Sequence, residues 1–177
     1  MTDTRLLDSA IRRIPDFPKP GILFYDITGI LVKPDAFKHC IDCMVELYKD
    51  KHIDAVAAIE SRGFLFAAPF AERLGIPLVL IRKKGKLPGK VYSCRYSLEY
   101  GTAEIEAHVS DIQAGKNYLL VDDLIATGGT LTAARKIIEQ GNASATDCFG
   151  VIGLPDLNYE KVLAPMHVTT LIDYHGA

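Results

Sequence analysis

A short apolar run that leads into paired acids and then into small residues places the strongest constraint on the fold of this chain. Tyr118 to Val121 are apolar and favour β-structure, as in a parallel strand that is covered on both faces. Asp122 and Asp123 follow, at the strand end where open α/β sheets form their ligand crevice. Ala126 to Thr130 then lead into a helical stretch that ends near Gln140. Glycines allow a tight turn here, and its backbone N–H groups together with the helix N-terminus favour a phosphate.

The two acids beside this phosphate cradle require a neutral or cationic neighbour, because two carboxylates repel a bare anion. Ribose hydroxyls and Mg²⁺ both meet that requirement. The pattern predicts a sugar phosphate whose diol lies over Asp122 and Asp123 and whose 5′-phosphate lies on Ala126 to Thr130. This stretch resembles the phosphoribosyl pyrophosphate (PRPP) motif of type I phosphoribosyltransferases, while an ordinary strand, turn and helix is the alternative.

Length and composition favour one globular domain. A chain of 177 residues is long enough for one hydrophobic core and short for two. Its apolar content of 49% and charged content of 24% are ordinary, and its net charge of −2 gives no support for a nucleic-acid partner. The N-terminus lacks an apolar signal core and no run reaches the length of a membrane span. We therefore expect a cytoplasmic protein with no membrane partner.

The cysteines give little evidence for a metal or redox site. Cys40 and Cys43 form a C-x-x-C pair, but no second pair with matching spacing accompanies it. Both lie in an amphipathic stretch, so we interpret them as reduced helix residues. A redox or metal role is the alternative.

Alternating strand-like and helical stretches predict a mostly parallel sheet with helices on both faces. Besides the strand and helix described above, we expect helices at residues 35–49, 64–74 and 158–163, and a first helix that is capped by Thr4 and reaches Ile14. Strands are expected at residues 55–59, 77–81, 147–153 and 168–172, with an antiparallel pair at 92–96 and 103–108. Residues 17–30 are expected to form an irregular strap, and residues 82–90 a loop.

Two cationic stretches could hold a leaving diphosphate at the same sheet edge. The turn Glu60 to Phe64 contains Arg62, whose planar guanidinium suits phosphate oxygens, although a surface ion pair with Glu60 is an equal alternative. The expected loop after residue 81 is strongly basic, although a solvated charged face is its alternative. Its clustered cations are Arg82, Lys83, Lys84 and Lys86.

The stretch S-L-E-Y-G, Ser97 to Gly101, lies between the two expected antiparallel strands. A glycine pivot would let such a segment close over the site, exclude water and deliver Glu99 as a proton donor or acceptor. The alternative is a hairpin tip with an exposed glutamate.

Together these stretches resemble the adenine phosphoribosyltransferase family. The match runs from about Phe17 to Thr130 and is looser toward the C-terminus. It consists of F-P-K-P-G-I-L-F-Y-D-I-T, E-S-R-G-F-L-F, R-K-K-G-K-L-P-G, Y-S-L-E-Y-G-T-A-E and V-D-D-L-I-A-T-G-G-T. The PRPP motif marks only the superfamily, whereas R-K-x-G-K-L-P and S-L-E-Y-G mark the adenine branch. The resemblance implies an α/β, single-domain type I phosphoribosyltransferase fold over residues 1–177. Its parts would be an N-terminal hood over about residues 1–34, a core over 35–177 and a flexible catalytic loop over 92–106.

Enzymes of that family join adenine to PRPP with Mg²⁺ and give AMP and pyrophosphate. The resemblance implies PRPP phosphate and ribose binding by Asp122, Asp123, Ala126, Thr127, Gly128, Gly129 and Thr130. It implies pyrophosphate binding by Ser61, Arg62, Arg82, Lys83 and Lys86, from the same or a neighbouring subunit of a homodimer. It further implies an adenine pocket of Leu23, Phe24, Tyr25 and Leu124. Glu99 would handle the proton, with Tyr100 on the same loop, and Asp122 and Asp123 would face Mg²⁺ through PRPP or water.

Two further expectations come from the same resemblance. The family has a non-proline cis peptide in its pyrophosphate turn, which we expect at Glu60 to Ser61. The family also commonly has F-R-D where this chain has Tyr25, and tyrosine lacks the permanent charge and the planar fork of arginine. An oxopurine phosphoribosyltransferase is therefore an alternative. A PRPP-sensing nucleic-acid regulator is another, although the roughly twenty residues before the strap are too few for a helix-turn-helix module.

Overall fold

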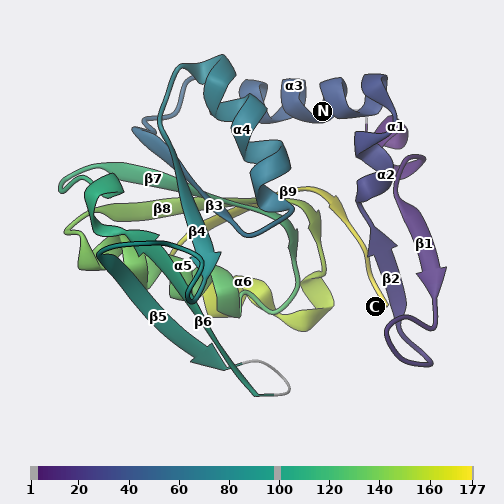
Figure 1. Ribbon diagram of the computed structural model, residues 1–177. Helices are drawn as coiled ribbons and strands as arrows, with labels where there is room; N and C mark the ends of the chain where they lie inside the picture. The colour runs from purple at the N-terminus through teal and green to yellow at the C-terminus, as the bar shows by residue number, and fades with distance from the viewer. Residues whose placement is uncertain (1–3, 98–100, 177) are drawn as a thin grey trace.

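The centre of the molecule is a seven-stranded mixed sheet (Figure 1). The computed structural model describes residues 4–97 and 101–176. The strands of this sheet are β3 (Ala55–Ile59), β4 (Leu78–Lys83), β5 (Val91–Ser97), β6 (Thr102–His108), β7 (Asn117–Ile125), β8 (Ser144–Gly153) and β9 (His167–Asp173). They lie in the order β5-β6-β4-β3-β7-β8-β9, and the four pairings from β4 to β9 are parallel. The prediction of a mostly parallel sheet is confirmed.

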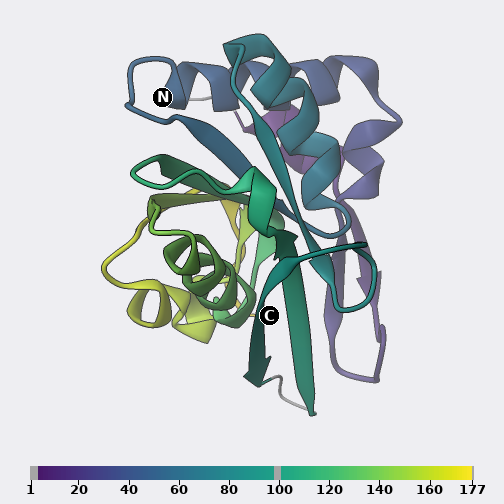
Figure 2. The same cartoon turned by 60° about the vertical axis from the view of Figure 1, so that its left-hand side comes forward.

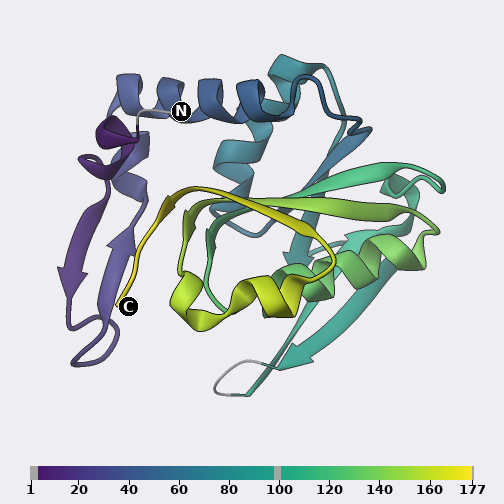
Figure 3. The same cartoon turned by 180° about the vertical axis from the view of Figure 1, so that it is seen from behind.

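Helices cover both faces of this sheet (Figures 1 and 3). The helices α3 (Pro34–Tyr48) and α4 (Gly63–Leu74) lie on one face, and α5 (Gly129–Gln140) and α6 (Tyr159–Leu163) lie on the other. The central strands send alternate side chains into two cores. In β3, Val56 and Ala58 belong to the core under α3 and α4, while Ala57 and Ile59 belong to the core over α5. Burial on both faces explains why this strand is apolar throughout.

The N-terminal region forms a small second layer, which we call the hood, beside the main sheet. It contains α1 (Arg5–Asp8), β1 (Arg12–Pro15), β2 (Leu23–Asp26) and α2 (Thr28–Leu31). The predicted helix to Ile14 is wrong after Asp8, because residues 12–15 pair with β2 and place Ile14 opposite Phe24. Thr4 precedes the helix but forms no side-chain cap. The predicted irregular strap is also wrong in part, since it contains β2 and α2.

The strands β5 and β6 form the antiparallel pair that the sequence predicts, with Val91 opposite His108 and Ser97 opposite Thr102. This hairpin and the β1–β2 pair of the hood extend in the same direction, away from α3 and α4 (Figures 1 and 2). Most of the predicted flexible loop over residues 92–106 therefore lies in two paired strands. Its mobility remains a prediction.

The predicted loop over residues 82–90 begins too early. Arg82 and Lys83 are the last residues of β4, where they pair with Glu106 and Ile105 of β6. The basic residues alone gave no sign of this pairing, because it depends on a strand that follows about twenty residues later in the chain.

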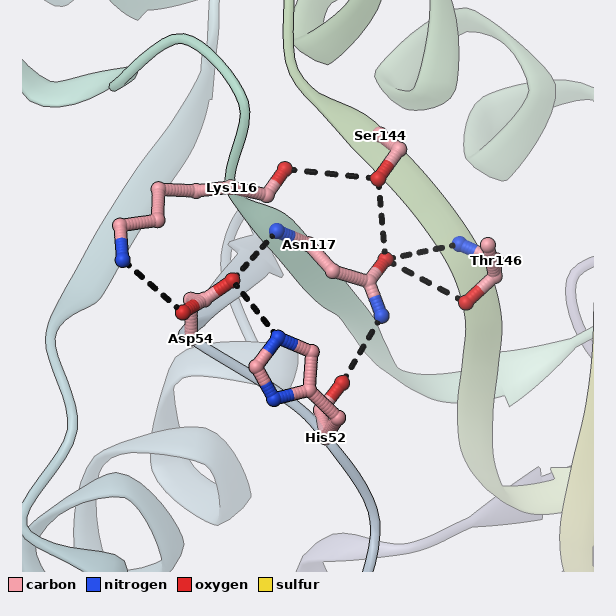
Figure 4. Close-up of polar contacts among 6 residues, drawn as sticks. All are labelled: His52, Asp54, Lys116, Asn117, Ser144 and Thr146. Carbon is pink, nitrogen blue, oxygen red and sulfur yellow. Dashed lines mark hydrogen bonds and ion pairs between the residues drawn. The ribbon is translucent and has the colours of Figure 1, made fainter.

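A cluster of polar side chains closes the amino end of the sheet, where β3, β7 and β8 begin (Figure 4). Asn117 lies at its centre: its side-chain oxygen accepts hydrogen bonds from Ser144 and Thr146, and its side-chain nitrogen donates to the carbonyl of His52 at 3.0 Å. Asp54 accepts a hydrogen bond from the backbone N–H of Asn117 at 2.8 Å. We call the following residues the amino-end cluster: His52, Asp54, Lys116, Asn117, Ser144 and Thr146.

All four cysteine thiols are free. Cys40 and Cys43 are buried on α3, and burial raises the pKa of both thiols. Within residues 4–97 and 101–176, no helix has both the length and the apolar character needed to cross a membrane.

Candidate active site

The loop between β7 and α5 forms a small pocket at the carboxyl end of the sheet. Gly128 turns the chain with φ of 81°, and a Cβ atom at this position would lie 2.9 Å from Cγ of Leu163. Both observations require glycine. The first backbone N–H groups of α5 have no partners within the helix, and its dipole adds positive potential. The pocket encloses about 90 Å³ and is lined by Asp122, Leu124, Ile125, Ala126, Thr127, Gly128, Gly129, Thr130 and Leu131.

The two acids lie inside β7, which corrects the prediction that they follow the strand. The strand continues to Ile125 because it keeps pairing with β8 beyond the acids. The backbone N–H of Asp123 donates to Oδ1 of Asp122 at 2.8 Å. Burial, together with the charge of Asp123, raises the pKa of Asp122 well above its ordinary value of 3.8. A carboxylate pair held in this way attracts a cationic or hydroxyl-bearing ligand.

Arg62 forms an ion pair with Asp123, and not with Glu60. Its Nε lies 2.5 Å from Oδ2 of Asp123. The arginine side chain remains 45% exposed, so it can reach a ligand in the adjoining pocket. That pocket is lined by Glu60, Ser61, Arg62, Lys83 and Asp123. The peptide bond between Glu60 and Ser61 is cis, as the family resemblance implies.

Glu60 organises the basic end of β4, a role that the sequence did not indicate. One carboxylate oxygen accepts a hydrogen bond from Nη2 of Arg82 at 3.1 Å, and the other accepts one from the backbone N–H of Lys83 at 2.8 Å. The hydrogen bond from Lys83 lowers the pKa of Glu60, although burial opposes it, and Arg82 lowers it further. Arg82 also donates to the carbonyl of Lys86 at 3.2 Å. Glu60 therefore fixes the side chain of Arg82 and the backbone of Lys83 at this edge.

A third pocket of about 210 Å³ connects the phosphate loop to the cationic turn. Its lining consists of Ile59, Glu60, Arg62, Lys83, Tyr96, Ile105, Asp122, Asp123, Leu124 and Thr130. Tyr96 was missed by the sequence analysis, although its hydroxyl lies 3.3 Å from Oγ1 of Thr130. The signal was available, because Tyr92, Cys94 and Tyr96 alternate along β5 and all pack toward the core over α5.

The site contains few protein ligands for a metal. Among the described residues, no group of three or more His, Cys, Asp or Glu side chains converges as a metal site. Asp122 and Asp123 supply two carboxylates only. That donor set suits Mg²⁺, which keeps several waters and is commonly held by one or two carboxylates together with substrate phosphates.

Comparison with known proteins identifies the family. The model of the phosphoribosyl transferase domain matches residues 27–156. The adenine phosphoribosyltransferase of Treponema denticola is 64% identical over 170 residues, which cover 96% of this chain and 90% of that protein. This chain belongs to the adenine phosphoribosyltransferase family.

Solved adenine phosphoribosyltransferases share the fold. The enzyme of Thermoanaerobacter pseudethanolicus is 40% identical with a TM-score of 0.92, and the match covers 95% of this chain and 98% of that one. The enzyme of Saccharomyces cerevisiae, solved with an imino-altritol bisphosphate and adenine, is 38% identical with a TM-score of 0.87 and covers 93% and 96% of the two chains. The type I phosphoribosyltransferase fold is thereby confirmed.

The residues that the family resemblance assigns to adenine come from two places. Leu124 lines the pockets beside the phosphate loop, whereas Leu23, Phe24 and Tyr25 lie on β2 of the hood. Phe24 contacts Phe17 edge to face, with ring centroids 5.1 Å apart. The Tyr25 side chain is buried, 7% exposed, and points into the contact between the hood and the rest of the chain.

Glu99 and Tyr100, which the resemblance assigns to the catalytic loop, lie outside the described residues. Their roles remain predictions. The side chain of Lys86 is not among the linings of the pockets described above, although its carbonyl accepts the hydrogen bond from Arg82.

Proposed function

We propose that this protein transfers the 5-phosphoribosyl group of PRPP to adenine and releases AMP and pyrophosphate. The observation that supports this function best is the continuity of three pockets. A phosphate cradle, two acids and a cationic turn follow one another along the carboxyl edge of the sheet. A ligand with phosphate at one end, a diol in the middle and pyrophosphate at the other end matches that order.

In this proposal each part of PRPP has a set of residues to bind it. The backbone of Ala126 to Thr130 holds the 5′-phosphate, and Asp122 and Asp123 accept hydrogen bonds from the ribose hydroxyls. Pyrophosphate binds to Ser61, Arg62, Arg82, Lys83 and Lys86. Arg62 must then share its guanidinium between Asp123 and phosphate oxygens, which a planar group with five N–H donors allows.

The chemistry follows from where charge develops. Cleavage of the bond between ribose C1 and pyrophosphate gives the sugar oxocarbenium character, and negative charge grows on the leaving group. The carboxylates of Asp122 and Asp123 stabilise the first charge, and Arg62 with its neighbouring cations stabilises the second. Mg²⁺, held by the two acids through PRPP or water, would neutralise part of the charge on the pyrophosphate. Glu99 would handle the proton of the attacking purine.

The base would lie between hood and sheet. Phe24 of β2 would face Leu124 across the purine, and backbone groups near Leu23 would distinguish a 6-amino from a 6-oxo base, while Tyr25 on the opposite face of the strand would support it from behind. Apolar ring faces do not make that distinction, whereas mismatched buried hydrogen-bonding groups do. An oxopurine substrate remains the rival because Tyr25 replaces the usual arginine of the family.

A cytoplasmic homodimer with a single domain per subunit completes this proposal. The family resemblance supports it. Light scattering coupled to size-exclusion chromatography gives the mass that tests the dimer, and a mass of about 19.4 kDa would contradict it.

The test of the function is AMP formation from adenine and PRPP with Mg²⁺, followed by the same assay with hypoxanthine and guanine. We expect adenine to give the highest kcat/KM. Preference for an oxopurine would contradict the base assignment alone, and no turnover of any base would favour the PRPP-binding regulator.

A further inference from the structure

The chain end after β9 is anchored beside the phosphate loop. The backbone N–H of Tyr174 donates to the carbonyl of Gly153 at 2.9 Å. Gly153 is the last residue of β8 and pairs with Ile125, which directly precedes the phosphate loop. Tyr174 therefore has a fixed place at the carboxyl edge of the sheet.

The side chain of Tyr174 contacts three elements of the hood. Its ring stacks on Tyr25 of β2, with centroids 4.0 Å apart and planes 5° from parallel. The guanidinium carbon of Arg13, in β1, lies 5.1 Å from the ring centroid. The hydroxyl donates to Oδ1 of Asp8, at the end of α1, at 2.6 Å. Asp8 also accepts a hydrogen bond from Arg13 at 2.6 Å, so the contacts form one connected group.

These contacts link the hood to the site edge through one side chain. Tyr25 directly follows Leu23 and Phe24 on β2, so the stack on Tyr174 restrains the same strand that carries these residues. The segment that follows β9 runs alongside β2 in Figures 1 and 3. Aromatic stacking, a cation over the ring and a charge-assisted hydrogen bond each favour one geometry.

We propose that Tyr174 is a positioning residue for the purine base. It holds β2 at the distance from the phosphate loop at which Leu23 and Phe24 meet the base, while PRPP binding depends on other residues. This inference rests on the proposed function. It also gives a role to Tyr25, which stands where the family commonly has arginine, because Tyr25 supplies the second aromatic ring of the stack.

The neighbouring residue provides a matched control. Nδ1 of His175 lies 2.9 Å from Oδ1 of Asp156, and the backbone N–H of Gly176 donates to the same carboxylate at 2.7 Å. Asp156 belongs to the short helix η2 (Pro155–Leu157), which follows β8 and is not part of the hood. His175→Ala thus loosens the tail without removing the stack on Tyr25.

The experiment measures kcat and both KM values for the full chain and for Tyr174→Ala, Tyr174→Phe and His175→Ala. We expect Tyr174→Ala to raise KM for adenine about tenfold, because it removes the stack, the cation contact and the hydrogen bond together. KM for PRPP should change less than about twofold. Tyr174→Phe keeps the ring contacts and should raise KM for adenine about threefold at most, and His175→Ala should leave both KM values near wild type.

A purely structural role would give a different result. Equal increases of both KM values in Tyr174→Ala, an unchanged KM for adenine, or the same change in His175→Ala would each overturn the proposal. Amide hydrogen exchange of residues 23–26 is compared in the same proteins, and we expect faster exchange only when the Tyr174 ring is removed. The exchange measurement does not depend on turnover, so the two claims can fail separately. A wild type that is inactive with adenine would refute the proposed function. Unchanged exchange in Tyr174→Ala would refute the role of Tyr174 in holding the hood.

Discussion

The two ends of the central sheet are built from the same strands, yet the polar side chains at the two ends have different surroundings. At the amino end, the side chain of Asn117 bonds to groups before β3 and in β8 through both of its polar atoms, and Asp54 accepts hydrogen bonds from the backbone of Asn117 and from Lys116 (Figure 4). At the carboxyl end of β7, by contrast, burial raises the pKa of Asp122, and Asp123 lies beside it.

The difference indicates that the polar groups at the amino end stabilise the fold, whereas those at the carboxyl end bind a ligand. The amino-end cluster satisfies its polar groups within the protein, so it holds the strands together without a ligand. At the carboxyl end, the burial of Asp122 and its repulsion by Asp123 cost free energy, and the hydroxyl groups of a bound sugar phosphate would offset that cost. Substitutions of the same chemical kind at the two ends should therefore have opposite consequences.

The largest effect is expected for Asp123→Asn and Asp122→Asn. Each change replaces a carboxyl group of the proposed ribose site with an amide, and kcat/KM for PRPP should fall about a hundredfold, as for loss of one strong transition-state contact. The control is Asp54→Asn in the amino-end cluster, which should leave kcat/KM near wild type. Comparable losses in all three variants would abolish the contrast between the two ends.

Asn117→Ala tests the opposite end. The change removes the hydrogen bonds from Asn117 to residues 52, 144 and 146, although the Ser144 and Thr146 hydroxyls keep bonds to Lys116 and Asp147. The free energy of unfolding should therefore fall by about 1 kcal/mol in urea titrations. Ser144→Ala, which removes a single donor, should cost less. We expect kcat/KM at a temperature well below the unfolding transition to be unchanged in both variants, and a drop in activity without a loss of stability would contradict this assignment.

Glu60→Gln tests whether Glu60 positions the basic end of β4 at the carboxyl end of the sheet. An amide in place of the carboxylate presents an NH₂ group toward a donor, either Arg82 or the backbone N–H of Lys83, and so loosens the cations that Glu60 fixes. KM for PRPP should rise about tenfold, equivalent to one hydrogen bond with a charged group. Glu104→Gln is the matched control, because Glu104 pairs with Lys84, which directly follows β4. A similar KM increase in the control would show that general charge, and not positioning, is responsible.

The smallest effect is a gain in stability from Asp122→Asn. The pKa of Asp122 is raised in the folded protein above its ordinary value of 3.8, so between these two values the native state binds more protons than the unfolded state. The stability of the wild type therefore falls as pH rises through this window, and the variant lacks that loss. Urea unfolding at about pH 5 and about pH 8 should show the variant more stable relative to wild type at the higher pH. A stability advantage of Asp122→Asn that shrinks as pH rises would contradict this prediction.

Local pattern was sufficient for much of the fold. The apolar run of residues 55–59 became β3 with the predicted bounds, and the helices predicted at 35–49 and 64–74 agree with α3 and α4 to within one residue at each end. Such segments are buried along their length or on one complete face, so hydrophobic periodicity carries the information. The order of glycines and acids after residue 121 likewise indicated a phosphate loop at a sheet edge.

Long-range pairing decided what local pattern could not. Residues 12–15 have the spacing of a helix but form β1, because β2 offers them hydrogen-bond partners, and β7 continues through both acids because β8 lies beside it. The partner of Arg62 is Asp123, 61 residues away, although Glu60 is its neighbour in sequence. Tyr25, which the family resemblance placed in the adenine pocket, stacks on Tyr174 near the chain end. The sequence by itself determined which residues carry charge, bend the backbone or favour burial. Which of them meet was decided by the tertiary structure, because hydrogen bonds, ring stacking and ion pairs act over a few ångströms in space and are independent of separation along the chain.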